Sequence, residues 1–286
     1  MKRVGFIGMG IMGRAMAKNL LEAGYELFIY SRTRDKASEL EEMGAVWCEN
    51  AGELSKRCQA VITTVGFPED VEQVYFGETG ILDSAYEGSY LIDMTTTSPK
   101  LSAKIFRSAK SRGLRALDAP VSGGDSGAKS ATLAIMVGGE KEDFDACLPI
   151  FQSMGKEICY MGGAGAGQHT KMANQIAISG AIAGLCEAIV YAEEAGINAA
   201  KMLEAIRTGA AGSAQLEIFG PRILKRDFAP GFYIKHFIKD MAIAKEELAS
   251  SKVRLEVLDK VFDMYCWLEK KDKGTLGTQA LIQYYE

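Results

Sequence analysis

Short apolar runs, many of them rich in β-branched residues, alternate with amphipathic stretches of about 10 to 15 residues between residue 2 and about residue 161. This alternation is typical of βαβ units, in which helices connect the parallel strands of one sheet. The expected strands are 3–7, 26–30, 60–65, 90–94, 115–117, 133–137 and 158–160, and the clearest helices are 11–23 and 100–112. Gly24 follows the first of these helices, where a C-terminal cap is expected. The first part of the chain is therefore predicted to be an α/β domain with a largely parallel sheet.

The pattern changes after Gly167, where apolar positions recur every three or four residues to the end of the chain. That spacing predicts amphipathic helices and no further strands. The segment 162–167 contains four glycines in six residues and marks a junction. We therefore predict a Rossmann domain over residues 1–163 and an all-α domain over 164–286, which begins with a long interdomain helix over about 168–195. The remaining helices are expected at 199–208, 213–226, 234–250, 255–270 and 275–285.

The overall charge argues against a nucleic-acid partner. The chain has 286 residues, of which 48% are hydrophobic and 24% charged, the composition of an ordinary globular protein. Its 33 Lys and Arg residues are outnumbered by 37 Asp and Glu residues, which leaves a formal charge of −4. No basic surface for nucleic acid or for an anionic membrane is expected from this balance.

Cysteine and histidine usage points to a cytoplasmic protein without a metal centre. The six cysteines show no CxxC spacing and there are two histidines, so neither a zinc cluster nor a disulfide framework is expected. The N-terminus lacks the pattern of a signal peptide. The apolar segment 176–192 is shorter than the ~20 residues that a membrane span needs, and it carries Glu187. We interpret it as a buried helix and expect no membrane partner.

Three glycines follow the first expected strand and open the first expected helix, in the order Gly8-Met-Gly10-Ile-Met-Gly13. In a dinucleotide-binding turn the first glycine permits the tight turn, the second lets the backbone approach a pyrophosphate, and the third lets helix and strand pack closely. The phosphates then lie at the positive end of the helix. The alternative is a glycine-rich turn of another Rossmann-like protein, such as a methyltransferase. The strand, turn and helix context favours a dinucleotide.

The residues after the second expected strand indicate which dinucleotide is bound. An acidic residue there would bond to the ribose 2′-hydroxyl of NAD and repel the 2′-phosphate of NADP. The chain instead reads Tyr30-Ser31-Arg32-Thr33-Arg34, which offers hydroxyl groups and guanidinium groups that pair with a phosphate. The alternative is a solvated basic loop that caps the next helix. The pattern predicts NADP, with Ser31, Arg32 and Thr33 as its contacts.

Four segments together resemble the β-hydroxyacid dehydrogenase family, which includes 3-hydroxyisobutyrate dehydrogenase and tartronate semialdehyde reductase. They are Gly5-Phe-Ile-Gly-Met-Gly-Ile-Met-Gly13, Asp118-Ala-Pro-Val-Ser-Gly-Gly124, Ile135-Met-Val-Gly-Gly139 and Gly165-Ala-Gly-Gln-His-Thr-Lys-Met-Ala-Asn174. The resemblance covers essentially the whole chain. The later segments 206–213, 230–232 and 238–240 look most similar to the tartronate semialdehyde reductase branch.

The resemblance implies a substrate-carboxylate site at Ser122, Gly123 and Gly124. Consecutive glycines let backbone N–H groups and a hydroxyl group converge on one anion, which suits a carboxylate. A plain glycine turn is the structural alternative.

The resemblance also places the catalytic lysine at Lys171, with Asn174 in support. Lys171, Asn174 and Gln175 share one face of the long helix by their spacing. A lysine near a nicotinamide can give a proton to a carbonyl oxygen as hydride reaches the carbon. An exposed surface lysine is the ordinary alternative. Some members of the family carry Asn four residues after the lysine, where this chain has Gln175.

Further contacts are implied by the same resemblance. Phe232 would line the substrate pocket and Asp240 would support the site, whereas Lys239 would reach the cofactor. The remaining cofactor contacts are expected at Gly8, Gly10, Ile11, Met12, Gly13, Val65 and Thr95.

The predicted activity is the reversible, NADPH-dependent reduction of a small semialdehyde acid in the cleft between the domains, with tartronate semialdehyde as the first substrate and glycerate as its product. The alternatives are a 3-hydroxyisobutyrate or 4-hydroxybutyrate type of dehydrogenase, or a non-catalytic NADP-binding sensor. The chain resembles imine reductases too, but these generally lack a lysine at the position of Lys171, and 6-phosphogluconate dehydrogenase needs a longer helical domain. Small residues along the long helix would permit contact with a partner subunit, so a homo-oligomer is possible.

Overall fold

The first unit, residues 1–171, contains one mixed sheet of nine strands. The structure is a computed structural model that describes residues 1–286. Six of the strands are parallel, in the order β3 (Val46–Trp47), β2 (Glu26–Tyr30), β1 (Arg3–Ile7), β4 (Ala60–Thr63), β5 (Tyr90–Asp93) and β6 (Arg115–Asp118). This 3-2-1-4-5-6 order is that of the Rossmann fold, which binds dinucleotides where the strand order reverses. Here the reversal lies between β1 and β4.

Three further strands extend the sheet beyond β6. The strand β8 (Leu133–Gly138) runs antiparallel to β6 and to the short β7 (Val121–Ser122), and β9 (Gly155–Gly162) pairs with β8 in parallel. The sheet is therefore largely parallel, as the sequence predicts, with an antiparallel step at β8.

Alternating side chains of the strands bury into two separate cores, one on each face of the sheet. In β4, Ala60 and Ile62 belong to one core and Val61 to the other. The helices α1 (Ile11–Glu22) and α8 (Lys141–Gln152) contribute to the first core, and α4 (Pro68–Phe76) and α6 (Pro99–Lys110) to the second. Helices thus cover both faces, which is why the strands read as continuous apolar runs. The shorter connections are η1 (Arg34–Ala37), α2 (Ser38–Glu42), α3 (Ala51–Ser55), α5 (Ile81–Ser84) and α7 (Gly124–Lys129).

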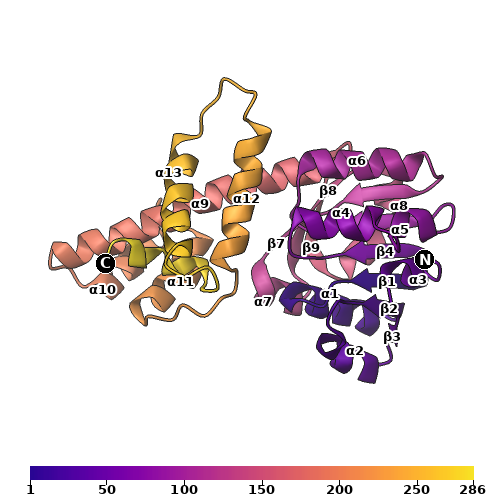
Figure 1. Ribbon diagram of the computed structural model, residues 1–286. Helices are drawn as coiled ribbons and strands as arrows, with labels where there is room; N and C mark the ends of the chain where they lie inside the picture. Colours follow the sequence, from indigo (N-terminus) through magenta and orange to yellow (C-terminus); the bar gives the residue numbers. More distant parts are fainter. The chain divides into compact units, whose positions relative to one another are not determined.

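The second unit, Met172–Glu286, is helical and has a core of its own. The long helix α9 (Ala166–Glu194) carries the chain from one unit to the next, and it is followed by α10 (Ala199–Ile206), α11 (Ala214–Leu224), α12 (Ile234–Glu247), α13 (Glu256–Glu269) and the 3₁₀ helix η2 (Thr278–Tyr284). Helices α12 and α13 lie side by side (Figure 1). The rings of Phe237 and Tyr265 meet edge to face in this core, with their centroids 5.2 Å apart.

The predicted elements are confirmed, with ends that differ by up to three residues, except at a few places. The sequence did not predict the two-residue strands β3 and β7, and β4 ends at Thr63 rather than at residue 65. The last segment was predicted as an α-helix over 275–285 but forms a 3₁₀ helix. Gly24 has a φ of +88° directly after α1, as its capping role requires.

Helix α9 is long and apolar enough to span a membrane by length and composition alone. Over an apolar stretch of 18 residues in this helix, 44% of the residues are buried within the protein. The helix is therefore only partly buried, whereas the sequence suggested a buried helix.

Candidate active site

The glycine turn after β1 has the geometry that each of its three glycines was predicted to need. Gly8 has a φ of +106°, and a Cβ at this position would lie 2.0 Å from the carbonyl oxygen that follows β4. A Cβ on Gly13 would lie 1.9 Å from the carbonyl oxygen of Gly8. Gly10, the N-cap of α1, has no atom within 4 Å of its Cβ position and offers no side-chain acceptor to the first turn. This open face at a helix N-terminus fits a pyrophosphate. Ile11 is exposed beside it, and Met12 packs against the sheet core.

The loop after β2 presents Arg32 to solvent, with Thr33 next to it. The Arg32 side chain is 75% exposed, and its Nη1 donates a hydrogen bond of 2.9 Å to Asp70 Oδ1. The Met9 N–H lies 3.5 Å from Ser31 Oγ, which joins the loop to the glycine turn. The sequence shows no acid at the end of β2, but the fold brings the carboxylate of Asp70 from α4 against the guanidinium group. A 2′-phosphate would compete with this carboxylate for Arg32.

The loops after β4 and β5 are joined at the two positions that were predicted to contact the cofactor. The Val65 N–H donates to Thr95 Oγ1 at 3.0 Å. The Thr95 N–H donates to Asp93 Oδ1 at 3.1 Å, and Thr63 Oγ1 donates to the same oxygen at 2.8 Å. Val65 and Thr95 therefore lie at neighbouring strand ends, at the edge of the sheet where Rossmann folds bind their ligands.

The structure brings Lys171 to the segment that was predicted to bind the substrate carboxylate. Lys171 is 7% exposed, and its Nζ donates to the carbonyl oxygen of Val121 at 2.8 Å. Ser122 follows directly, and Gly123 and Gly124 have φ values of +131° and +64°. Successive N–H groups in a glycine turn can bind one anion together, an arrangement called a nest, and this turn is the candidate for it. A buried ammonium group thus lies one residue away from the predicted carboxylate site.

The second unit holds a chain of polar side chains that includes three predicted site residues. Lys239 Nζ lies 3.0 Å from Asp240 Oδ1, and Asp240 is 1% exposed. Gln175 Nε2 donates to Asp240 Oδ2 at 2.7 Å, and Asn174 Nδ2 donates to Gln175 Oε1 at 2.7 Å. Gln175 is therefore the link between Asn174 and Asp240, a role that the sequence did not reveal. Phe232 is partly buried, with its ring 5.7 Å from that of Phe237.

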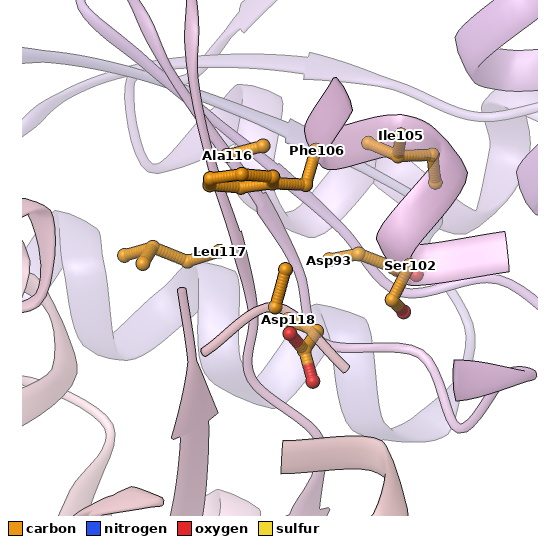
Figure 2. A pocket seen from close by; sticks show the side chains of 8 residues that line it. Asp93, Ser102, Ile105, Phe106, Ala116, Leu117 and Asp118 are labelled. Carbon is orange, nitrogen blue, oxygen red and sulfur yellow. The ribbon is translucent and has the colours of Figure 1, made fainter. Parts of the chain in front are cut away.

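A small cavity lies behind the strand ends of the first unit, between β5, β6 and α6. Its volume is about 10 Å³, room for about one water molecule. Figure 2 shows the side chains of Asp93, Ser102 and Asp118 at this cavity and the ring of Phe106 above them. Asp93 Oδ2 and Ser102 Oγ are buried without a hydrogen-bond partner. The cavity is too small for a nicotinamide or a substrate.

Burial changes the acidity of both carboxyl groups at this cavity. It raises the pKa of Asp93 from 3.8 to about 6, although hydrogen bonds from Thr95 and Thr63 oppose the shift. Burial also raises the pKa of Asp118, against the stabilising N–H groups of Gly165 and Gln168. Asp118 is structural, because both of its oxygens accept hydrogen bonds, from the N–H groups of Gly165 and Gln168. Asp93 accepts hydrogen bonds through Oδ1 alone.

Two family models match the chain in succession. Residues 3–163 match the NAD binding domain of 6-phosphogluconate dehydrogenase, and residues 165–285 match the NAD-binding domain of NADP-dependent 3-hydroxyisobutyrate dehydrogenase. The chain belongs to the β-hydroxyacid dehydrogenase family. As a member it is an NAD(P)-dependent oxidoreductase, which confirms the predicted family, fold class and enzyme class.

Relatives of this β-hydroxyacid dehydrogenase are similar along its whole length. An uncharacterized oxidoreductase of Bacillus subtilis, YkwC, is 50% identical over 284 residues, which are 99% of each chain. The 2-hydroxy-3-oxopropionate reductase of Escherichia coli is 36% identical over 99% of this chain and 97% of its own. The structure of 3-hydroxyisobutyrate dehydrogenase of Mycobacterium tuberculosis with L-serine has a TM-score of 0.91 at 29% identity, with 100% of this chain and 99% of that one covered.

Proposed function

We propose that the protein reduces tartronate semialdehyde to glycerate with NADPH, and that Lys171 supplies the proton. The observation that carries this proposal is the 2.8 Å contact of Lys171 Nζ with Val121 O, directly before the nest of Ser122, Gly123 and Gly124. An aldehyde whose carboxylate is bound in that nest has its carbonyl oxygen within a few bonds of the anion. The ammonium group is held by the same strand end that forms the nest.

The reaction needs a hydride donor, an anion site and a proton donor. When bound, the reduced dinucleotide supplies the hydride to the aldehyde carbon. Ser122 and the N–H groups of Gly123 and Gly124 bind the carboxylate. Lys171 donates its proton to the carbonyl oxygen, the C=O double bond becomes a C–O single bond, and solvent then returns the proton to the lysine. In the opposite direction the neutral amine accepts the hydroxyl proton.

The choice of substrate draws on a relative as well as on the site. The Escherichia coli protein described above is named for 2-hydroxy-3-oxopropionate, which is tartronate semialdehyde. A carboxylate nest accepts other small semialdehyde acids too, so the dehydrogenation of 3-hydroxyisobutyrate, or of 4-hydroxybutyrate, is the second candidate. Within this second candidate, the homologous structure of 3-hydroxyisobutyrate dehydrogenase favours 3-hydroxyisobutyrate over 4-hydroxybutyrate.

Oxidation of NADPH with a panel of aldehydes tests this function. We expect the highest kcat/KM with tartronate semialdehyde among the semialdehydes of tartronate, methylmalonate and succinate, with glyoxylate as a further member. Methylmalonate or succinate semialdehyde as the best substrate would select the second candidate. No turnover with any of them would leave a dinucleotide-binding sensor.

Replacement of the proposed proton donor gives the sharper test. Lys171→Ala should lower kcat by about 10²- to 10⁴-fold, the contribution of a positioned acid, while NADPH still binds. Lys201→Ala is the control, because Lys201 is an exposed lysine of α10. Turnover of Lys171→Ala within a few-fold of the control would remove Lys171 from the mechanism.

We also infer a preference for NADPH over NADH. Support comes from the hydroxyl and guanidinium groups of Ser31, Arg32 and Thr33 at the end of β2, and from the second matching family model, which describes an NADP-dependent enzyme. Arg32 is exposed enough to meet a phosphate.

A further inference from the structure

Gln168, near the start of α9, makes a two-point contact with the loop that follows β5. Its side chain is completely buried. Nε2 donates to the carbonyl oxygen of Thr95 at 2.7 Å, and Oε1 accepts from the N–H of Thr97 at 3.0 Å. The amide thus satisfies one backbone acceptor and one backbone donor of the same loop, as a neighbouring strand would. This contact fixes the orientation of the loop as well as its distance from the helix.

The loop held by Gln168 continues to the expected cofactor contacts. Thr95 Oγ1 accepts from the N–H of Val65, so the loop after β4 is connected to the loop after β5. Thr95 is also held from the sheet by Asp93, through its N–H. Gln168 therefore contacts this pair of loops from a helix, whereas Asp93 contacts it from the sheet.

The backbone of Gln168 is fixed at the same time. Its N–H donates to Asp118 Oδ2 at 2.9 Å, and the N–H of Gly165 donates to Asp118 Oδ1 at 2.7 Å. The carboxylate of Asp118, at the end of β6, thereby binds the N–H groups at the start of α9. Lys171 follows Gln168 by three residues, so the two side chains lie on the same face of the helix.

We propose that Gln168 is a positioning residue that couples the loop Thr95–Thr97 to the helix turn that carries Lys171. Loss of the side-chain amide leaves the carbonyl oxygen of Thr95 and the N–H of Thr97 buried without partners. The loop must then shift to reach water, and both the dinucleotide contacts and the ammonium group lose their fixed separation. The part that concerns Lys171 rests on the proposed function, whereas the part that concerns the dinucleotide does not.

Methionine substitution at two buried glutamines tests this role. Gln168→Met keeps the size of the side chain but removes both hydrogen bonds. Gln279→Met is the matched control, because Gln279 is also completely buried and its Nε2 donates to the carbonyl oxygens of Asp227 and Ala229 in the second unit. Gln168→Glu, which keeps an acceptor for Thr97 but offers no donor to Thr95 when ionised, is the second variant if Gln168→Met folds poorly.

The first measurement is NADP⁺ binding by calorimetry, which requires no turnover. We expect the dissociation constant to rise about tenfold in Gln168→Met and Gln168→Glu, and to change by less than about twofold in Gln279→Met, although both methionine variants lose thermal stability. If Gln168 had a purely structural role, the melting temperatures of Gln168→Met and Gln279→Met would both fall, but the two variants would bind NADP⁺ equally well. Binding of NADP⁺ by the Gln168 variants as tight as in the parent protein would overturn the inference.

The second measurement is kcat at saturating NADPH with the best aldehyde. We expect a decrease of about tenfold in Gln168→Met and none in Gln279→Met. If the parent protein reduces no aldehyde, the proposed function fails while the binding measurement still decides the role of Gln168. An unchanged kcat in Gln168→Met beside weakened NADP⁺ binding would overturn the coupling to Lys171.

Discussion

Single side chains show that a sequence motif and its tertiary partner have to be considered together. Arg32 was predicted to bind a phosphate, and it does lie exposed at the end of β2, but it is paired with Asp70. Ion pairs this exposed contribute little to stability, so the pair can open for a ligand with a higher charge. Neighbouring Arg34 differs, because its Nε and Nη2 both donate to Glu41. The structure thus gives the two arginines of this loop different acidic partners.

The cofactor preference should depend on Arg32 and not on Arg34. We expect the parent protein to prefer NADPH by at least about tenfold in kcat/KM, since one charge-assisted hydrogen bond contributes about 1.5–3 kcal/mol. The double variant Ser31→Asp/Arg32→Leu should abolish or reverse this preference, and Arg34→Leu should retain it. The measurement is kcat/KM with both dinucleotides at one salt concentration. If the parent protein prefers NADH, Arg32 does not bind the 2′-phosphate of NADP.

Asp93 is a second residue whose behaviour follows from its surroundings. Its pKa is raised from 3.8 to about 6 in the fold, so the folded state binds the proton more tightly than the unfolded state does. Ionisation of Asp93 therefore lowers the unfolding free energy. This loss is absent below about pH 4, grows between pH 4 and pH 6, and is complete above pH 6, where it amounts to about 3 kcal/mol.

Asp93→Asn should remove this dependence. Asparagine keeps the Oδ1 acceptor for Thr63 and Thr95 and carries no charge into the cavity. We expect the variant and the parent protein to have similar unfolding free energies near pH 3, where Asp93 is protonated in both the folded and the unfolded state, and the variant to be the more stable by up to about 3 kcal/mol at pH 8. Urea denaturation at both pH values provides the measurement. A difference that stays constant with pH would contradict the raised pKa.

At the scale of elements, α9 shows how one helix uses glycine in two ways. A Cβ on Gly167 would lie 2.4 Å from the carbonyl oxygen of Met136 and 2.8 Å from Asp118 Oδ2, because the start of the helix approaches β8 and β6 closely. Gly184, further along the same helix, is exposed and has no atom within 4 Å of its Cβ position. The first glycine is required by packing, and the second only weakens the helix.

Alanine at these two positions should therefore act in opposite directions. Gly167→Ala should lower the unfolding free energy by about 1–3 kcal/mol, because backbone atoms must move. Gly184→Ala should raise it by about 0.5–1 kcal/mol, because alanine favours the helix. Both values come from urea denaturation monitored by circular dichroism. A destabilised Gly184→Ala variant would show that this helix face is covered by something that the isolated chain does not contain.

At the scale of the whole molecule, the chain forms two units with separate cores. The first unit contains the glycine turn, the loop after β2 and Lys171, whereas Asn174, Asp240 and Lys239 belong to the second. Each unit contains one of the two tryptophans, Trp47 in β3 and Trp267 in α13. The stability of each unit is therefore accessible by fluorescence of a variant that keeps a single tryptophan.

Dinucleotide binding should stabilise the first unit more than the second. In Trp267→Phe, where Trp47 reports, NADP⁺ at one hundred times its dissociation constant should raise the unfolding free energy by about 2.7 kcal/mol. In Trp47→Phe, where Trp267 reports, we expect less than half of that shift. Urea denaturation with and without NADP⁺ measures both, and equal shifts would mean that the two units unfold as one.

The sequence alone determined the features that depend on near neighbours. Strands and helices followed from the period of their apolar positions, and the glycine turn followed from residues within one strand and helix start. Only the tertiary structure decided which distant groups meet: Asp70 is 38 residues from Arg32, and Gln168 is 73 residues from Thr95. The strands β3 and β7 were missed for the same reason, because two residues carry no periodicity and become strands only when a neighbour supplies hydrogen bonds. The predicted site residues came from sequence motifs, whereas their partners and the acidity of Asp93 arise from burial and from contacts that no local pattern encodes.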